Sequence, residues 1–267
     1  MNSPAIKIIV LRGAGGAAPD LAMFQTGVDS TRTFVRIDYP GWRRYVGVGY
    51  SARAIVDDLV SRITQQVPTG PIYIVGLSIG GHFGYATALR LQELGREVGG
   101  FCAVDTFMMS TAAVSDGWSR RALMLASRLI LGLRFAEFRE FIRTRFWRAW
   151  LRMLRGTLPG LLRNYAGSGR QPWFFKLDPS LEQELSMRLL IEHAAPFVAS
   201  LDINPVPLNA PAILLRTETT GKDDAAWQQR CPRLVIRKLP GDHQTIFEPQ
   251  SHALIREAFV SESVYWR

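Results

Sequence analysis

The motif Gly76-Leu77-Ser78-Ile79-Gly80 constrains the fold of this chain more than any other feature. It follows the apolar run 72–75, which is typical of a buried strand, and it precedes a helical pattern at residues 82–94. A serine between two glycines at such a junction is typical of a nucleophile elbow, a sharp turn that exposes the hydroxyl group. The small glycines let the strand and the helix pass closely. Ser78 is therefore a candidate nucleophile, and the alternative is a serine that only caps the helix.

The remainder of the chain alternates between short apolar runs and helical patterns. Ser51 is placed to cap a helix that runs to about residue 66. A series of this kind closes into a mostly parallel sheet with helices on both faces, which predicts an α/β fold. The 267 residues, 47% of them hydrophobic, fit one α/β domain over 1–267 with a helical insertion at about 108–200. Further strands are expected at 5–11, 33–37, 98–104, 212–216 and 234–239.

Two further polar residues are expected at the carboxyl ends of strands, where parallel sheets gather functional groups. His243 follows the strand 234–239, and Asp105 ends the strand 98–104. Together with Ser78 they give the chain order Ser, Asp, His of an α/β-hydrolase triad, with His243 as the base and Asp105 as the acid. Asp223 and Asp224 are rival candidates for the acid. The other three histidines, His82, His193 and His252, are expected to be packing or surface residues.

The glycine-rich loop Gly13-Ala14-Gly15-Gly16 follows the first expected strand. It lacks the spacing of a dinucleotide fingerprint, and the chain has no P-loop motif, so nucleotide binding is disfavoured. In a serine acyl-transfer enzyme a loop at this place gives one backbone N–H to the oxyanion hole, and the residue after the nucleophile gives the other. Ala14 and Ile79 are the corresponding residues, and the alternative is a tight turn that needs glycine for backbone reasons.

The composition argues against several other classes. Cys102 and Cys231 lie far apart, and the four histidines form no metal-ligand pattern with them, so neither a metal nor a disulfide is expected. The apolar run at residues 8–11 is too short for a signal peptide, and no uncharged run reaches the length of a membrane span. A cytoplasmic protein is therefore expected.

The motifs resemble those of the thioesterase domains of polyketide and nonribosomal-peptide synthases, which belong to the α/β-hydrolase superfamily. The likeness covers residues 5–107 and 210–260 and is weak between them. It implies catalysis by Ser78, Asp105 and His243, without a cofactor, on an acyl chain that the phosphopantetheine of a carrier protein presents. The position of Asp105 resembles the product-releasing class, whereas Asp223 and Asp224 stand where many proof-reading type II members have the acid. The resemblance also implies that the insertion forms a lid over the site. The matching segments are the glycine loop, residues 76–81, residues 104–106, and residues 241–243 followed by Ile246 and Phe247.

One part of the insertion carries a net charge equal to that of the whole protein. Residues 118–163 hold eleven arginines against two glutamates, a net charge of +9. Part of this segment is an amphipathic pattern with arginines on one face and apolar residues on another. Such a face is a solvated surface, a docking site for an acidic carrier protein, or a peripheral contact for an anionic membrane. Nucleic-acid binding has only the charge in its favour. The arginines of this face are Arg145, Arg148, Arg152 and Arg155.

The function expected from these features is acyl transfer to Ser78 from a carrier-bound thioester, followed by hydrolysis or cyclisation. The alternatives are another serine acyl-hydrolase or acyltransferase, a type II proof-reading thioesterase, and a basic binding module without activity.

Overall fold

The computed structural model places the chain in two compact units. The first comprises Met1–Pro40, Tyr50–Thr111 and Met187–Arg267, and the second comprises Gly41–Gly49 and Ala112–Ser186. The structure describes residues 6–13, 22–25, 31–107, 139, 142–143, 146–147, 149–151, 153–154, 157–203, 205–220, 223–243 and 245–266.

A sheet of six parallel strands forms the centre of the first unit, in the order β2-β1-β3-β4-β5-β6. The order changes direction at β1, because the chain moves from β1 to β2 on one side and then returns to place β3 on the other. The carboxyl ends of β1 and β3 therefore form a topological switch point, where open α/β sheets place their ligands. The α/β class and the parallel sheet predicted from the sequence are confirmed. The strands are β1 Ile6–Leu11, β2 Arg32–Ile37, β3 Ile72–Leu77, β4 Val98–Val104, β5 Ala212–Thr217 and β6 Leu234–Leu239.

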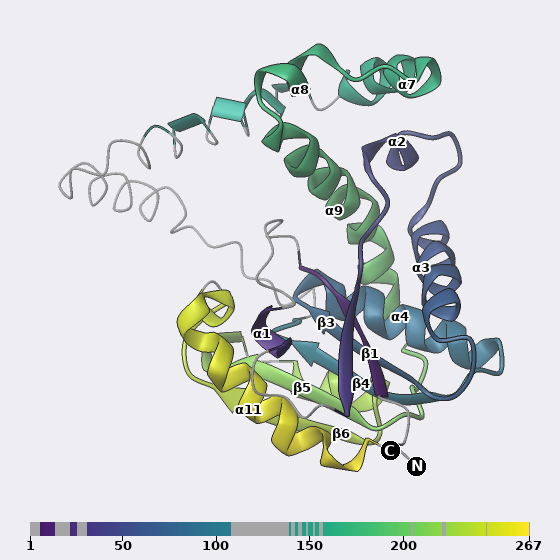
Figure 1. Cartoon of the computed structure of the whole chain (residues 1–267), viewed down its shortest axis with the longest axis vertical. Helices are drawn as coiled ribbons and strands as arrows, with labels where there is room; N and C mark the ends of the chain where they lie inside the picture. The colour runs from purple at the N-terminus through teal and green to yellow at the C-terminus, as the bar shows by residue number, and fades with distance from the viewer. Residues whose placement is uncertain are drawn as a thin grey trace. The chain divides into compact units, whose positions relative to one another are not determined.

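Helices cover both faces of this sheet. Helices α1 and α11 lie on one face, and α3 and α4 lie on the other (Figure 1). The α-helices of the first unit are α1 Ala22–Gln25, α3 Ala52–Gln66, α4 Ile79–Glu93, α10 Asp224–Arg230 and α11 His252–Glu262, together with the later part of α9 Ser180–Ile203. Among the described residues of this unit, single turns of 3-10 helix occur at η2 Glu218–Thr220, η3 Thr245–Phe247, η4 Pro249–Ser251 and η5 Ser263–Tyr265.

Successive side chains of a strand point to opposite faces of the sheet, so the sheet carries a hydrophobic core on each face. Ile8 and Val10 of β1 join Phe24 and Phe259 in one buried cluster on the α1 and α11 face. On the opposite face, Gly84 of α4 lies against Phe101 and Ile74. All six residues of β3 and of β5 are buried, so neither strand has an exposed side, as expected for a sheet covered on both faces. The last two residues of β5, Arg216 and Thr217, are polar and yet buried.

The helix after Ser78 begins earlier than the sequence predicts. We expected it at residues 82–94, but α4 starts at Ile79. Glycine is unfavourable inside a helix, so helix propensity alone disfavours Gly80 and Gly81 in this element. Tertiary packing explains why glycine occurs here, because this part of the helix leaves no room for a side chain. A Cβ on Gly80 would lie 2.6 Å from the carbonyl oxygen of Arg12. The predicted cap at Ser51 is confirmed, since its Oγ accepts a hydrogen bond from the Ala54 N–H at 3.3 Å.

The second unit includes a short segment that the sequence analysis did not assign to it. Trp42, at the start of α2, donates its backbone N–H to Ser186 Oγ at 3.1 Å and its indole N–H to Glu182 Oε1 at 3.2 Å. Its ring contacts Phe175 edge to face. The segment is thus joined to residues more than a hundred positions later. The described helices of this unit are α2 Trp42–Tyr45, α7 Leu158–Ser168, α8 Trp173–Leu177 and the first part of α9.

One domain over 1–267 with a lid at about 108–200 stays a prediction. Within the part of the chain that the structure describes, no helix is both long and apolar enough to cross a membrane.

The close approach of β3 and α4 gives a prediction for stability. A Cβ at Gly76 would lie 2.5 Å from the Cα of Gly81, so Gly76→Ala must push the strand and helix apart. We expect a loss of about 3 kcal/mol in the free energy of unfolding, measured by urea denaturation. Gly160→Ala in α7 is the control, because no atom lies within 4 Å of the added Cβ, and this change should be neutral or stabilising. Equal stability of both variants would contradict the packing argument.

Candidate active site

Ser78 occupies a strained turn between β3 and α4. Its backbone has φ 52° and ψ −121°, a conformation that residues other than glycine rarely adopt. The turn is held by a hydrogen bond from the Ser78 N–H to the Val104 carbonyl at 2.8 Å, and by one from the Thr106 hydroxyl to the Ser78 carbonyl at 2.8 Å. The end of the neighbouring strand β4 and the residues just after it therefore fix the serine in a backbone geometry that costs about 1–3 kcal/mol.

The loop after β1 reaches the same turn. A Cβ on Gly13 would lie 3.3 Å from the Cβ of Ser78 and 3.2 Å from the Leu77 carbonyl oxygen. The start of the glycine loop thus lies against the serine at the switch point between β1 and β3. Gly13 leaves the space that this approach needs.

A chain of hydrogen bonds joins the three residues that the sequence analysis singled out. Ser78 Oγ lies 3.1 Å from His243 Nε2, and His243 Nδ1 lies 2.6 Å from Asp105 Oδ2. A carboxylate oxygen only accepts, so Nδ1 carries a hydrogen and donates it to Asp105. Nε2 of the neutral ring is then an acceptor that faces the serine hydroxyl, which is the arrangement of a nucleophile with its base and an orienting acid.

Asp105 is fully buried, and its other oxygen is also occupied. Oδ1 accepts hydrogen bonds from the Thr217 N–H at 2.8 Å and from the Thr217 hydroxyl at 3.0 Å. Its backbone φ is 46°, and within the described ranges only Asp105 and Ser78 combine a side chain with a positive φ. Backbone strain of this kind concentrates at functional sites. Thr217, at the end of β5, thus holds the Asp105 carboxylate in place, and the sequence analysis did not identify it. Its only signal in the sequence is a hydroxyl residue at the carboxyl end of an expected strand.

A short turn with internal hydrogen bonds holds His243. Gly241 has φ 104°, and Asp242 and Thr245 exchange hydrogen bonds, with the Thr245 N–H donating to Asp242 Oδ1 at 3.0 Å. The imidazole lies edge to face against Phe107 and Phe247, at ring-centre distances of 5.1 Å and 5.5 Å. These contacts orient the ring toward Ser78.

Asp223 and Asp224, the alternative candidates for the acid, pair with an arginine. Arg216 is buried, donates to Asp223 Oδ1 at 2.6 Å, and also forms an ion pair with Asp224. Both carboxylates lie within nine residues of this arginine along the chain, and they neutralise its charge. The structure brings Asp105, and neither of the rivals, to His243.

The other histidines contact backbone or aromatic groups. His82 is buried and its Nε2 donates to the Phe107 carbonyl at 3.0 Å, His193 packs edge to face on Tyr50, and His252 Nε2 lies 3.3 Å from the Phe247 carbonyl. No cluster of three or more His, Cys, Asp or Glu suited to a metal occurs among the residues described.

The two cysteines are free and buried. Desolvation by burial raises the pKa of Cys102 far above its usual value and raises that of Cys231 to about 12. Both thiols are therefore protonated near neutral pH, and neither competes with Ser78 as a nucleophile.

Only part of the predicted oxyanion hole can be located. Ile79 is the first residue of α4, where backbone N–H groups have no partner within the helix, and it follows Ser78 directly. Ala14 lies outside the described residues. The predicted docking residues Arg145, Arg148, Arg152 and Arg155 also lie outside them.

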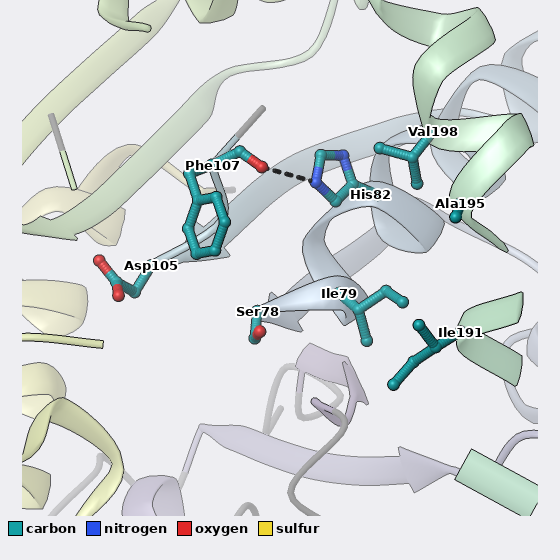
Figure 2. Close-up of a pocket in the computed structure, with 8 residues that line it drawn as sticks. All are labelled: Ser78, Ile79, His82, Asp105, Phe107, Ile191, Ala195 and Val198. Carbon is teal, nitrogen blue, oxygen red and sulfur yellow. Dashed lines mark hydrogen bonds between the residues drawn. The ribbon is translucent and has the colours of Figure 1, made fainter. Parts of the chain in front are cut away.

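A small pocket opens at Ser78 within the first unit. It has a volume of about 150 Å³. Figure 2 shows side chains of α9 facing Ile79 and His82 of α4 across it. The sequence analysis did not identify α9 as a wall, because its apolar pattern equally fits packing in the core. The pocket is lined by Ser78, Ile79, His82, Asp105, Phe107, Ile191, Ala195 and Val198.

Comparison with known proteins shows the family to which this chain belongs. The chain matches the alpha/beta hydrolase family over residues 8–259, and it belongs to that family of hydrolases. A comparison with curated protein sequences gives no match.

Several solved structures of thioesterases share the fold. The NocB thioesterase domain, in covalent complex with a fluorophosphonate nocardicin G analogue, is 18% identical with a TM-score of 0.59, covering 97% of this chain and 95% of that one. The Vlm2 thioesterase domain is 15% identical with a TM-score of 0.61, covering 97% and 94%. The RedJ thioesterase of the prodiginine pathway in Streptomyces coelicolor is 15% identical with a TM-score of 0.59, covering 97% and 87%. At this level of identity the likeness establishes the fold.

The two sets of aspartates give contrasting predictions. Asp105→Asn should lower the rate of Ser78 acylation about 10⁴-fold, because an asparagine in its place favours the wrong tautomer of His243. Asp223→Asn should leave that rate per folded molecule unchanged but lower the free energy of unfolding by about 2 kcal/mol, because buried Arg216 loses one carboxylate partner and keeps Asp224. Single-turnover kinetics and urea denaturation measure the two effects. A slow but fully stable Asp223→Asn variant would make Asp223 the acid.

Proposed function

We propose that this protein is a serine thioesterase that takes an acyl chain, polyketide or peptidyl, from the phosphopantetheine thioester of a carrier protein onto Ser78. The observation that carries the proposal is the hydrogen-bonded series from Ser78 through His243 to Asp105. The chain's membership of the alpha/beta hydrolase family and its likeness to thioesterase domains support the choice of reaction.

The first half of the proposed reaction forms an ester. His243 Nε2 removes the hydroxyl proton of Ser78 as Oγ attacks the thioester carbonyl carbon, and Asp105 stabilises the imidazolium. The N–H groups of Ile79 and Ala14 donate to the oxyanion of the tetrahedral intermediate. The intermediate collapses, the carbon–sulfur bond breaks, and the pantetheine thiolate leaves with the proton that His243 held. An acyl ester on Ser78 remains.

The second half releases the acyl chain. His243 takes a proton from water, or from a nucleophile within the chain, as that group attacks the ester carbonyl, and then returns the proton to Ser78 Oγ. Water gives a free acid and an internal nucleophile gives a ring. The chemistry needs no metal or cofactor, and it would take place in the cytoplasm, where carrier-bound chains are built.

The position of the acid supports the product-releasing class over the type II arrangement. Asp105 ends the strand that follows the nucleophile helix, and it is hydrogen-bonded to His243. Asp223 and Asp224 are paired with Arg216. Another serine acyl-hydrolase acting on oxygen esters would use the same residues, and turnover of matched ester and thioester substrates separates it from a thioesterase.

A fluorophosphonate tests the proposed nucleophile. The similar NocB thioesterase domain forms a covalent complex with a fluorophosphonate. We expect such a probe to label Ser78, and Ser78→Ala to abolish labelling and lower thioester turnover by about four to six orders of magnitude. Peptide mapping by mass spectrometry locates the adduct, and thermal denaturation verifies that the variant folds. Labelling that persists in Ser78→Ala would contradict the assignment of Ser78 as the nucleophile.

The insertion is proposed to form a lid whose arginines dock an acidic carrier protein. Reversing Arg148 and Arg152 to glutamate should weaken turnover of carrier-bound substrate, chiefly through the association rate and most strongly at low salt. Turnover of an acyl-N-acetylcysteamine thioester should hardly change, since that substrate carries no charge.

The control replaces two exposed arginines of the first unit, Arg53 and Arg233, with glutamate, which changes the net charge by the same amount as the Arg148 and Arg152 variant. This control should retain carrier-dependent turnover. Equal loss on both substrates in the Arg148 and Arg152 variant would mean that these arginines only support the structure of the insertion. A loss confined to liposome binding would favour the peripheral membrane alternative.

A further inference from the structure

The pocket at Ser78 is smaller than a site for a whole ligand. Its volume of about 150 Å³ lies below the 300–1,000 Å³ of typical small-molecule sites. An apolar cavity of about this size holds a molecule such as benzene, which has six carbons. The pocket therefore has room for the first few atoms of an acyl chain, next to the carbonyl carbon that Ser78 attacks.

One face of α9 forms a wall of this pocket. Ile191, Ala195 and Val198 are spaced four and three residues apart, which places them in one row along the helix. Val198 is 1% exposed, whereas Ile191 is 39% exposed. The row thus runs from a buried end to a solvent-accessible end, and its central residue, Ala195, has the smallest side chain (Figure 2).

The facing wall is apolar as well. Ile79 and Phe107 contribute hydrocarbon groups. Two polar residues of the lining already have partners in the protein: His82 donates its Nε2–H to the Phe107 carbonyl, and Asp105 accepts from His243 and Thr217. A charged or strongly polar acyl group would lose its hydration against these walls without equivalent hydrogen bonds.

We infer that this pocket selects an apolar, un-ionised acyl group of up to about six carbons at the thioester end of the substrate, and that Ala195 sets the limit. The inference rests on the proposed function in one respect, the role of Ser78 as nucleophile. The reason for the limit is steric: α9 and α4 face one another across the cavity, and Ala195 has the smallest of the three α9 side chains that line it, so a larger side chain there takes space that the acyl group needs.

A series of n-alkyl fluorophosphonates, from ethyl to decyl, tests the inference without requiring turnover of a thioester. The second-order rate constant for labelling Ser78 should rise about fourfold with each methylene until about six carbons, and should stop rising beyond. Ala195→Leu fills the space of about three carbons and should move the maximum to chains about three carbons shorter. Val198→Ala should move it about two carbons longer.

Ala199→Leu is the matched control, since Ala199 lies on the exposed side of α9 and outside the pocket lining. Its profile should equal that of the wild type. Identical profiles for the wild type, Ala195→Leu and Val198→Ala would overturn the inference, and so would an equal shift in Ala199→Leu.

The two proposals fail in different ways. No labelling of Ser78 at any chain length would remove the nucleophile and both proposals with it. Labelling with a flat dependence on chain length would overturn the pocket inference alone. The expected profile without any turnover of acyl thioesters would support the pocket and contradict the thioesterase reaction.

Discussion

The close contact between β3 and α4 is the constraint on which the site depends. Gly76 and Gly80 have no side chains at the positions where the strand, the helix and the end of β1 meet. This space permits the positive φ of Ser78, which turns its hydroxyl toward His243. A larger residue at either glycine would move the Ser78 hydroxyl relative to His243 Nε2. In enzymes a displacement of about 1 Å between reacting groups is enough to lower the rate about 10²-fold. Packing and reactivity are therefore set by the same atoms.

The sheet brings the remaining groups to that turn. Parallel strands end at one edge, so Asp105 after β4, Thr217 at the end of β5 and the loop after β6 lie close together despite their distance along the chain. Asp105 is buried and receives three hydrogen bonds, two from Thr217 and one from His243. These bonds compensate for its removal from water and fix the imidazole in one orientation.

The sequence predicted the parts of this arrangement that depend on local residue patterns or on the common edge at which parallel strands end. The strand boundaries at 98–104 and 234–239 agree with the structure, and residues at the carboxyl ends of predicted strands were correctly expected to converge. Long-range packing was not predictable in this way. The start of α4 was missed because helix propensity disfavours Gly80 and Gly81, and tertiary contact outweighs that propensity. The link from Trp42 to Glu182 and the pocket wall on α9 depend on residues far apart in sequence, with no motif between them.

The central claim is that Ser78 forms a covalent acyl intermediate, and rapid-quench mass spectrometry tests it most directly. The protein is mixed with an acyl-N-acetylcysteamine thioester for milliseconds, stopped in acid, and digested. The account predicts a mass increase equal to one acyl group, located on Ser78 and decaying as product appears. Thioester turnover with no acyl adduct on Ser78 at any time, or with the adduct on another residue, would contradict it.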